Sequence, residues 1–586
     1  MPDVLNNQSL LNTSIPDGAI VQSGGAASAT VTTSTGQAAQ NAKFDENLTK
    51  INRESKEKQF QENAKNLGMS YVNISTTPIN PDLLRLIPPE KARSGLILPF
   101  FRLGKKLRVT TATPDAPETR AIIDDLKAQG YAININLSTP EGILEAIRLY
   151  DTDVYKTKKE ISTTLNEEKI QAYEEEIKAL NDLKNRIKVV PSEEAVYLIN
   201  IGALKTGASD IHIEPEENFV RFRFRIDGVL HQIFDLDKAS FVNISNQIKY
   251  HAKMKLNISN IPQDGRYSFT VNDRKIDLRV SSLPTEFGET FVCRLLDSGR
   301  HLVSFEDLGF SGMYLKKIEK LATISHGMIL VTGPTGSGKT TSLYTLLSKF
   351  NTPQAKIITL EDPIEYHLPG ISQSQINEKR EYSFASGLRA VLRQDPDVVM
   401  IGEIRDLETA ETAAQAALTG HVMLSTLHTN SAIETIPRLI NIGLPAFMVA
   451  PALNTIIAQR LVRKICRNCQ EMKEVDKAVQ EEIQKILEII RKVQPTTEVV
   501  IPEKLPVALG CEVCSHTGYK GRLCIVEMLE VDFEIRDLIL AKASSTKIIE
   551  AARRKGMLTM KEDGILKVIN GETTLEEVHR VTTIAD

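Results

Sequence analysis

Residues 333–341, with the sequence GPTGSGKTT, are of the types that bind a phosphate chain, and they fit the pattern G-x-x-x-x-G-K-[ST]. Glycine lets a loop come close to an anion and turn its backbone N–H groups toward it. A helix beginning at Lys339 would point the positive end of its dipole at the same anion, while Lys339 would reach the β and γ phosphates. The predicted nucleotide-binding residues are Gly333, Thr335, Gly336, Ser337, Gly338, Lys339, Thr340 and Thr341, and the Thr340 hydroxyl is also a predicted Mg²⁺ ligand.

The flanking sequence supplies the strand and the helix that such a loop needs. Residues 328–331 form a short apolar run, and residues 341–347 place apolar side chains at helical spacing. A chance glycine-rich turn with a lysine is therefore the weaker interpretation. We predict strands at 328–332, 356–360, 398–402 and 422–426, and helices at 339–349, 384–393 and 407–419. This alternation predicts an α/β fold with a parallel sheet, whose ligand lies at the carboxyl ends of the strands.

Two acidic clusters follow predicted strands at that edge. They are EDPIE at 361–365 and GEIRD at 402–406. Hydrolysis of a γ-phosphate needs one carboxylate to hold Mg²⁺ and another to orient the attacking water, and the two strand ends can supply both. His428 follows the strand at 422–426 and is a candidate sensor of the γ-phosphate, although a lone histidine is usually a structural hydrogen-bonding group.

The segment 190–297 contains a set of arginines suited to clamping phosphate. The set is Arg266, Arg279 and Arg294. An arginine donates hydrogen bonds in pairs and stays charged, so we expect at least two of the three to reach phosphate, rather than simply to pair with nearby carboxylates. In VRFRFRI at 220–226, strict alternation places three further arginines on one face of a strand, where they need an anionic neighbour.

Two C-x-x-C pairs predict a metal site. They are Cys466 with Cys469 and Cys511 with Cys514. Two such turns make a tetrahedral four-sulfur site that suits Zn²⁺, whereas a redox dithiol would need a thioredoxin-like βαβ pattern, which surrounds neither pair. The intervening segment 470–510 contains a predicted helix at 477–492. Cys293 and Cys524 lack such a partner, and we expect both to be buried as small apolar side chains.

The length of 586 residues predicts several domains, and the net charge of −4 gives no indication of nucleic-acid binding. Residues 1–43 are rich in small and polar side chains, which predicts a disordered tail, with a docking peptide as the alternative. No apolar run approaches the roughly 18 residues that cross a bilayer, so we expect a cytoplasmic protein whose membrane association goes through partners. We expect a disordered tail at 1–59, a small α+β domain at 60–150, a charged helical linker at 151–189, a second α+β domain at 190–297, a linker at 298–312, a P-loop core at 313–465, a tetracysteine insertion with the return to the core at 466–528, and a helical region at 529–586.

Together these motifs resemble the secretion ATPase superfamily over about 190–580, specifically its type IV pilus assembly and type II secretion motors. LEDPIEY at 360–366 resembles the family's aspartate box, GEIRD its atypical Walker B, and STLHTN at 425–430 its histidine box. ASDIHIEP at 208–215 is similar to its second N-terminal domain. The resemblance implies the following roles: Glu365 as the catalytic carboxylate, Glu403 as the residue that positions Mg²⁺, His428 near the γ-phosphate, and Arg266, Arg279 and Arg294 as arginines that reach the phosphates.

The resemblance also implies a RecA-like ATPase domain preceded by a PAS-like α+β domain, in a homohexamer that binds ATP between the two domains. It implies Mg²⁺ and Zn²⁺ as cofactors, and a location at the inner face of the cytoplasmic membrane on a platform protein. The tetracysteine site favours pilus extension or secretion over retraction. Residues 1–60 depart from related motors, which begin with a helical half that binds a cyclic dinucleotide, and the segment between the cysteine pairs is unusually long.

Two other functions fit the phosphate loop. One is a nucleic-acid translocase, against which the balanced charge argues, so that we expect no nucleic-acid partner. The other is a nucleotide-gated assembly factor with little turnover, against which the acidic strand ends argue.

Overall fold

The computed structural model describes residues 55–151 apart from 76, 78 and 80, then 183, 186–271, 274–297, 303–495 and 499–582. Residues 1–54 of the expected tail lie outside the described residues. The expectation of disorder is wrong for 55–59, because residues 55–66 are helical. This segment is rich in lysine, glutamate and glutamine, which are strong helix formers, and it buries Ala64. Glu57 on this helix accepts a hydrogen bond of 3.0 Å from Asn73.

The N-terminal domain is a four-stranded sheet with helices, as its predicted α+β character requires. Its strands lie in the order β1-β4-β3-β2. They are β1 (Ser70–Tyr71), β2 (Ile97–Leu103), β3 (Lys106–Thr111) and β4 (Ala132–Leu137), with the helices α2 (Pro81–Leu84), α3 (Pro89–Ser94), α4 (Pro117–Ala128) and α5 (Pro140–Ile147). Helices α3, α4 and α5 begin with proline, whose missing N–H needs no partner there.

The second domain is an antiparallel sheet in the order β7-β6-β5-β10-β9-β8. Its elements are α9 (Ser192–Lys205), β5 (Ala208–Pro215), β6 (Val220–Ile226), β7 (Val229–Leu236), α10 (Lys238–His251), β8 (Gln263–Val271), β9 (Arg274–Thr285) and β10 (Gly288–Asp297). Strand β6 buries its apolar side chains on one face, and the three arginines on the other face meet the expected acids. Arg221 pairs with Glu216 at 3.0 Å, Arg223 with Glu214, and Arg225 with Asp210 at 3.6 Å. The predicted linker at 151–189 lies mostly outside the described residues.

The ATPase domain contains a seven-stranded sheet in the order β13-β12-β14-β15-β11-β16-β19, parallel except for β19. Its strands are β11 (Gly327–Thr332), β12 (Ile357–Glu361), β13 (Ser372–Gln375), β14 (Val398–Ile401), β15 (Val422–Leu427), β16 (Leu453–Ile465) and β19 (Tyr519–Glu530). Its helices are α11 (Met313–Leu321), α12 (Lys339–Phe350), α13 (Phe384–Val391), α14 (Leu407–Leu418), α15 (Thr435–Ile442) and α16 (Ala446–Ala452). The predicted α/β alternation is therefore confirmed. Strands β11, β12, β14 and β15 are buried at every position, which explains their mostly apolar sequences.

The expected linker at 298–312 is wrong for residues 303–312, which pack onto the ATPase domain. Phe305 and Phe310 are buried in its core, and the carbonyl oxygen of Leu308 accepts a hydrogen bond of 2.7 Å from the Cys524 N–H. The two aromatic side chains remove too much apolar surface from water for this segment to stay detached.

The C-terminal part adds a small two-stranded antiparallel sheet and several helices. The strands are β17 (Gln470–Glu474) and β18 (Lys504–Ala508), and the helices are α17 (Lys477–Val493), which lies between the two strands in the chain, α18 (Phe533–Leu540), α19 (Ser545–Arg554), α20 (Met560–Ile569) and α21 (Leu575–Thr582). The predicted helix at 477–492 is confirmed as α17. Its apolar stripe, including Ile483, Leu487 and Ile490, packs with Ile565 of α20 and Val578 of α21, so the long segment between the cysteine pairs contributes to a hydrophobic core.

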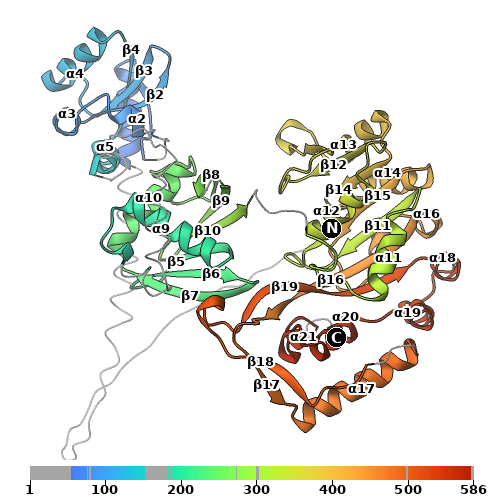
Figure 1. Cartoon of the computed structure of the whole chain (residues 1–586). Coiled ribbons are helices and arrows are strands. Elements are labelled where there is room, and N and C mark those ends of the chain that lie inside the picture. Colours follow the sequence, from blue (N-terminus) through green and yellow to red (C-terminus); the bar gives the residue numbers. More distant parts are fainter. Residues whose placement is uncertain are drawn as a thin grey trace, which may run out of the picture.

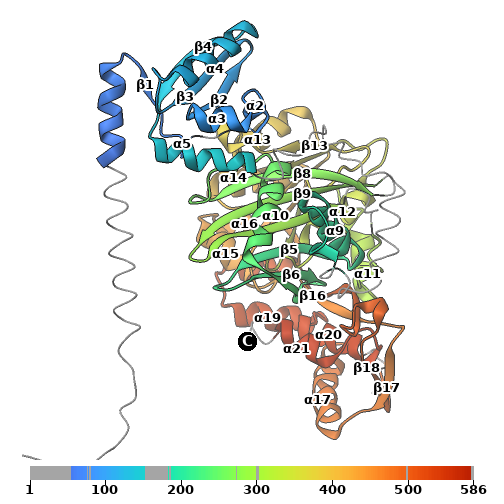
Figure 2. The ribbon, with the colours of Figure 1, turned by 90° about the vertical axis from the view of Figure 1, so that its left-hand side faces the viewer.

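Hydrogen bonds between residues far apart in the sequence join these domains to one another. Figures 1 and 2 show the N-terminal domain and the C-terminal helices at opposite ends, with the second domain beside the ATPase domain between them. Arg279 of β9 donates to the Ile364 carbonyl oxygen at 3.3 Å, and Asp227 accepts a bond of 2.9 Å from the Gly521 N–H. Asn257 accepts a bond of 3.4 Å from the Ile79 N–H in the N-terminal domain.

Glu577 fastens α21 to β16 through a buried ion pair. Its carboxylate accepts bonds from the Arg463 guanidinium at 2.7 Å, the Arg463 N–H at 3.0 Å and Arg580 at 2.7 Å. Burial alone would raise the pKa of Glu577, but the two arginines outweigh burial and lower this pKa to about 2. The ion pair therefore stabilises the folded state at pH values above 4.5, the ordinary pKa of a glutamate, and this stabilisation is lost as the pH falls toward 2.

We predict that Glu577→Gln lowers the melting temperature at pH 7 and that this difference shrinks by more than half at pH 3, because the wild-type carboxylate loses its advantage there. The measurement is thermal unfolding followed by circular dichroism at both pH values. Glu576→Gln, an exposed neighbour, is the control and should match the wild type. An equal difference at both pH values would contradict this role of the charge.

Candidate functional site

The phosphate loop connects the end of β11 to the start of α12. Gly333 has a φ of 147°, and a Cβ there would lie 2.5 Å from the Gln459 carbonyl oxygen, so that only glycine fits. Gly338 caps α12 in the left-handed region, with a φ of 87°. The loop therefore turns sharply twice and presents the N-terminus of α12 at the carboxyl edge of the sheet, which is a favourable place for an anion.

Lys339 lies across this loop. Its ammonium group donates to the carbonyl oxygens of Gly333 at 2.9 Å and Pro334 at 3.1 Å. Burial lowers the pKa of Lys339, and the charge of Glu403 partly opposes the shift. Thr335 and Thr340 are exposed at the mouth of the loop, where their hydroxyl groups are accessible to a ligand.

Glu403 and His428 meet beside the loop. Glu403 follows β14, His428 follows β15, and His428 Nε2 lies 3.5 Å from a carboxylate oxygen of Glu403. Arg405 forms an ion pair with the same carboxylate. Burial, followed by the charge of Lys339, lowers the pKa of His428, which favours its neutral form. The sequence predicts these residues at one edge of the sheet. In the structure Lys339, Glu403 and His428 lie close enough for the charge of Glu403 to act on the pKa of both Lys339 and His428.

The acidic cluster at 361–365 divides into two parts. Glu361 is buried, where it accepts hydrogen bonds from the Tyr344 hydroxyl and from Gln373 Nε2 at 3.1 Å. Glu365 is exposed and lines a cavity of about 670 Å³ between the second domain and the ATPase domain. Arg266 and Arg279 line the same cavity. Only Glu365 of the two glutamates is therefore placed to meet a ligand between the domains.

The three arginines predicted to bind phosphate form a row across the sheet of the second domain. Arg266 of β8 lies directly opposite Arg279 of β9, which lies opposite Arg294 of β10. All three line a cavity of about 550 Å³. Like charges at directly opposed positions repel each other, so an anion beside this row would relieve the repulsion.

The row is only partly compensated within the protein. Arg294 donates to Asp210 at 2.8 Å, so this arginine pairs with a nearby carboxylate, which was the alternative to binding phosphate. Within the described parts of the chain, neither Arg266 nor Arg279 forms an ion pair with a carboxylate. Arg279 instead contacts the backbone of the loop that carries Glu365. The cavity lined by Glu365 therefore also holds two arginines available to an anionic ligand.

Sequence reasoning missed the polar residues that support the site. Gln459 of β16 is fully buried and bonded to the phosphate loop, while Tyr344 and Gln373 hold Glu361 inward. Gln459 lies in the apolar strand β16, Tyr344 in α12 and Gln373 in the polar strand β13, and none of the three belongs to a motif. Their partners are distant in sequence, so spacing gives no signal for them.

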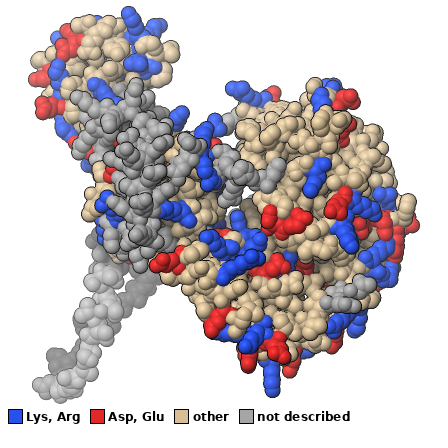
Figure 3. Space-filling view, viewed as in Figure 1, with Lys and Arg blue, Asp and Glu red and all other residues tan. Residues whose placement is uncertain are grey.

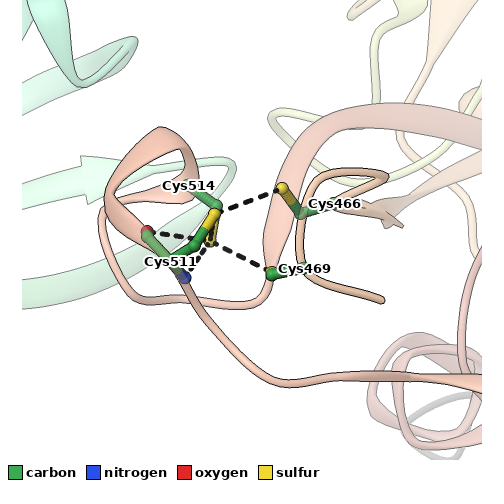
Figure 4. A group of neighbouring side chains, drawn as sticks. All are labelled: Cys466, Cys469, Cys511 and Cys514. Atoms are coloured by element: carbon green, nitrogen blue, oxygen red, sulfur yellow. Dashed lines mark hydrogen bonds between the residues drawn. The ribbon is translucent and has the colours of Figure 1, made fainter. Parts of the chain in front are cut away.

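The four cysteines converge on one point, as Figure 4 shows. The sulfur of Cys511 lies 4.0 Å from that of Cys466 and 3.8 Å from that of Cys514, and Cys469 lies 3.8 Å from Cys514. Zn–S bonds of about 2.3 Å in tetrahedral geometry separate sulfurs by about 3.8 Å. The observed separations therefore fit a Zn²⁺ ion held by four thiolates.

Backbone and side-chain donors point at these sulfurs. The N–H groups of Gly510 and Gly518 donate to Cys469 and Cys514 at 3.3 Å each, and the Asn468 amide donates to Cys511 at 3.4 Å. The Asn468 bond, together with bonds from Cys514 and Cys469, lowers the pKa of Cys511 to about 6, whereas burial and bonds with the other three cysteines raise the pKa of Cys469 to about 12. Such donors stabilise thiolates and orient them for a metal.

The other two cysteines are buried as expected. Burial raises the pKa of Cys293 and of Cys524 to about 12.

Among the described residues, no helix is both long and apolar enough to cross a membrane.

The chain is similar to known proteins over most of its length. Residues 187–580 match the family described as type II/IV secretion system protein, and residues 67–155 match the MshEN domain. The type IV pilus assembly ATPase PilB of Myxococcus xanthus is 37% identical over 518 residues, which cover 88% of this chain and 89% of PilB.

The chain belongs to the type II/IV secretion system protein family. The type II secretion system protein E of Aeromonas hydrophila is 42% identical and covers 80% of this chain and 90% of its own. A solved structure of the pilus retraction motor PilT with bound ADP is 28% identical over 66% of this chain and 96% of its own, with a TM-score of 0.43. The resemblance stated from the motifs is confirmed. The chain is an ATPase of this family.

We predict that the purified protein holds about one zinc ion per chain and that Cys466→Ser loses most of it, because three thiolates bind Zn²⁺ less tightly than four. The melting temperature should fall by about 5 °C or more. Metal analysis and calorimetry measure the two effects, and Cys293→Ala is the control for the metal content. Full zinc retention in Cys466→Ser would show that the four cysteines do not form the site.

Proposed function

We propose that this chain is a hexameric motor that hydrolyses Mg-ATP and drives assembly of a type IV pilus or of a type II secretion pseudopilus. The observation that carries the proposal is the arrangement around the interdomain cavity. The uncompensated Arg266 and Arg279 line this cavity with Glu365, and Arg279 contacts the segment that follows β12 of the ATPase sheet. A phosphate chain reaching from the loop at Lys339 toward this cavity would satisfy cations of both domains.

We assign each residue the role that its position supports. Lys339 and the backbone of residues 333–341 bind the phosphates, Thr340 and Glu403 hold Mg²⁺, and Glu365 orients the attacking water. Mg²⁺, when bound, neutralises charge on the phosphate oxygens. Arg266 and Arg279 stabilise the charge of the transition state, while Arg294 shares its charge with Asp210 and acts at longer range. His428 beside Glu403 is placed to respond to the γ-phosphate.

The relatives support the partners that we propose. PilB and protein E are named for pilus assembly and type II secretion, so we place this chain at the inner face of the cytoplasmic membrane on a platform protein. The four-cysteine site supports extension or secretion. We propose no nucleic-acid partner, because acidic and basic side chains alternate over the face in Figure 3 without a continuous basic surface. Rotation of the second domain against the ATPase domain would transmit the work of hydrolysis.

We predict that Lys339→Ala and Glu365→Gln each lower ATPase turnover by about 10²-fold or more, because one removes a phosphate contact and the other the group that orients water. Steady-state phosphate release measures this, and Glu319→Gln, an exposed change on α11, is the control. Added DNA should leave every rate unchanged. Stimulation by DNA would contradict the proposed secretion-motor function. Full activity in Glu365→Gln would show that Glu365 is not the group that orients the attacking water.

The arginine row allows a matched comparison. We expect Arg279→Ala to lower kcat by about 10²-fold and Arg225→Ala to change it by less than about threefold. Both are strand arginines at the same level of one sheet, since Asp210 lies opposite Arg225 on one side and Arg294 on the other. Arg225, however, already pairs with Asp210 and the Gly228 carbonyl. Equal losses in the two variants would show that the row acts through domain stability and not through the phosphates.

A further inference from the structure

A buried glutamine supports the phosphate loop from the side of the sheet. Gln459 lies on β16, which runs parallel to β11, and Ala458 is paired with Thr332. Gln459 is therefore one residue beyond the end of β11, at the level where the loop begins. Its side chain has an exposed fraction of 0%. A polar side chain in this position is costly to bury unless its amide group is fully used.

Both ends of the amide are used, and each has a different partner. Gln459 Nε2 donates to the Ser337 carbonyl oxygen at 2.8 Å, while Oε1 accepts from the Ser342 hydroxyl at 2.9 Å. Ser342 lies on α12 and is itself buried. The serine hydroxyl fixes the orientation of the amide, so that the NH₂ group faces the loop.

The contact to Ser337 determines the direction of the next N–H group. In a trans peptide the C=O and the following N–H point in opposite directions. Because Gln459 holds the Ser337 oxygen on the sheet side, the Gly338 N–H points to the opposite, open side of the loop. Gly338 also fits closely, since a Cβ there would lie 3.2 Å from Gln459 Nε2.

We propose that Gln459 is a positioning residue, which holds the peptide between Ser337 and Gly338 in the orientation that directs the Gly338 N–H at the phosphate chain. This inference rests on the proposed use of the loop as the ATP site. Gln459 does not touch the nucleotide. It acts by keeping the loop in its binding conformation before ATP arrives, which reduces the free energy needed to order the loop.

A purely structural role has a different consequence. A glutamine that only fills the core would, when replaced, lower the melting temperature and leave the nucleotide affinity of the folded protein unchanged. A positioning residue changes the affinity itself. The loss should appear in the Kd of ADP and in the KM of ATP more than in kcat, because the N–H contact is made in both the ground state and the transition state.

The test uses the full-length protein with a fluorescent ADP analogue, together with steady-state ATP hydrolysis. In Gln459→Leu, of similar size and without the amide, we expect the Kd of ADP and the KM of ATP to rise about tenfold. In Ser342→Ala the amide remains but loses its orienting bond, so the rise should be about threefold. Thr455→Val is the control, because Thr455 is buried on the same face of β16 four residues earlier and lies outside the loop.

The outcomes separate this inference from the proposed ATP site. If Gln459→Leu binds ADP as the wild type does, or if Thr455→Val weakens binding equally, Gln459 has no positioning role. If Gln459→Leu does not fold, Ser342→Ala decides, and wild-type affinity in that variant overturns the inference. If the wild type binds no nucleotide, the proposed ATP site fails instead.

Discussion

Uncompensated positive charge between two domains is the constraint on which the functional part of this structure depends. Arg266 and Arg279 lie directly opposite each other on neighbouring strands, and neither has an ion-pair partner in the described chain. Repulsion between such neighbours disfavours the arrangement unless an anion occupies the space beside them. The phosphate loop and Lys339 lie on the other domain. An ATP molecule between the two would therefore contribute to holding the domains together, and its hydrolysis would alter that contact.

Strand β16 connects the loop to the rest of the ATPase domain. It contains Gln459, which holds the loop, and Arg463, which is bonded to Glu577 of α21 and lies over the Tyr519 ring at 4.0 Å. The next residue after the strand is Cys466 of the four-cysteine site. One strand thus joins the phosphate loop, the C-terminal helices and the proposed zinc site.

Local patterns made the ATPase domain predictable. The apolar strands, the glycine loop and the C-x-x-C pairs each carry their signal within a few residues, and the parallel alternation places the strand ends at one edge. The register of the arginine row could not be predicted, because it depends on how β8, β9 and β10 pair across turns. The division between Glu361 and Glu365 depends on Tyr344 and Gln373, which lie on other elements. The packing of residues 303–312 was missed for the same reason: the partner strand β19 follows about 200 residues later in the sequence.

The most direct test of charge compensation between the domains is a structure of the protein with Mg²⁺ and a slowly hydrolysed ATP analogue. We predict that, in at least one nucleotide-filled site, the γ-phosphate lies within hydrogen-bond distance of Lys339 and of the Arg266 or Arg279 guanidinium. A phosphate chain that contacts only the loop at 333–341, with both arginines left without an anion, would contradict the central role of the arginine row.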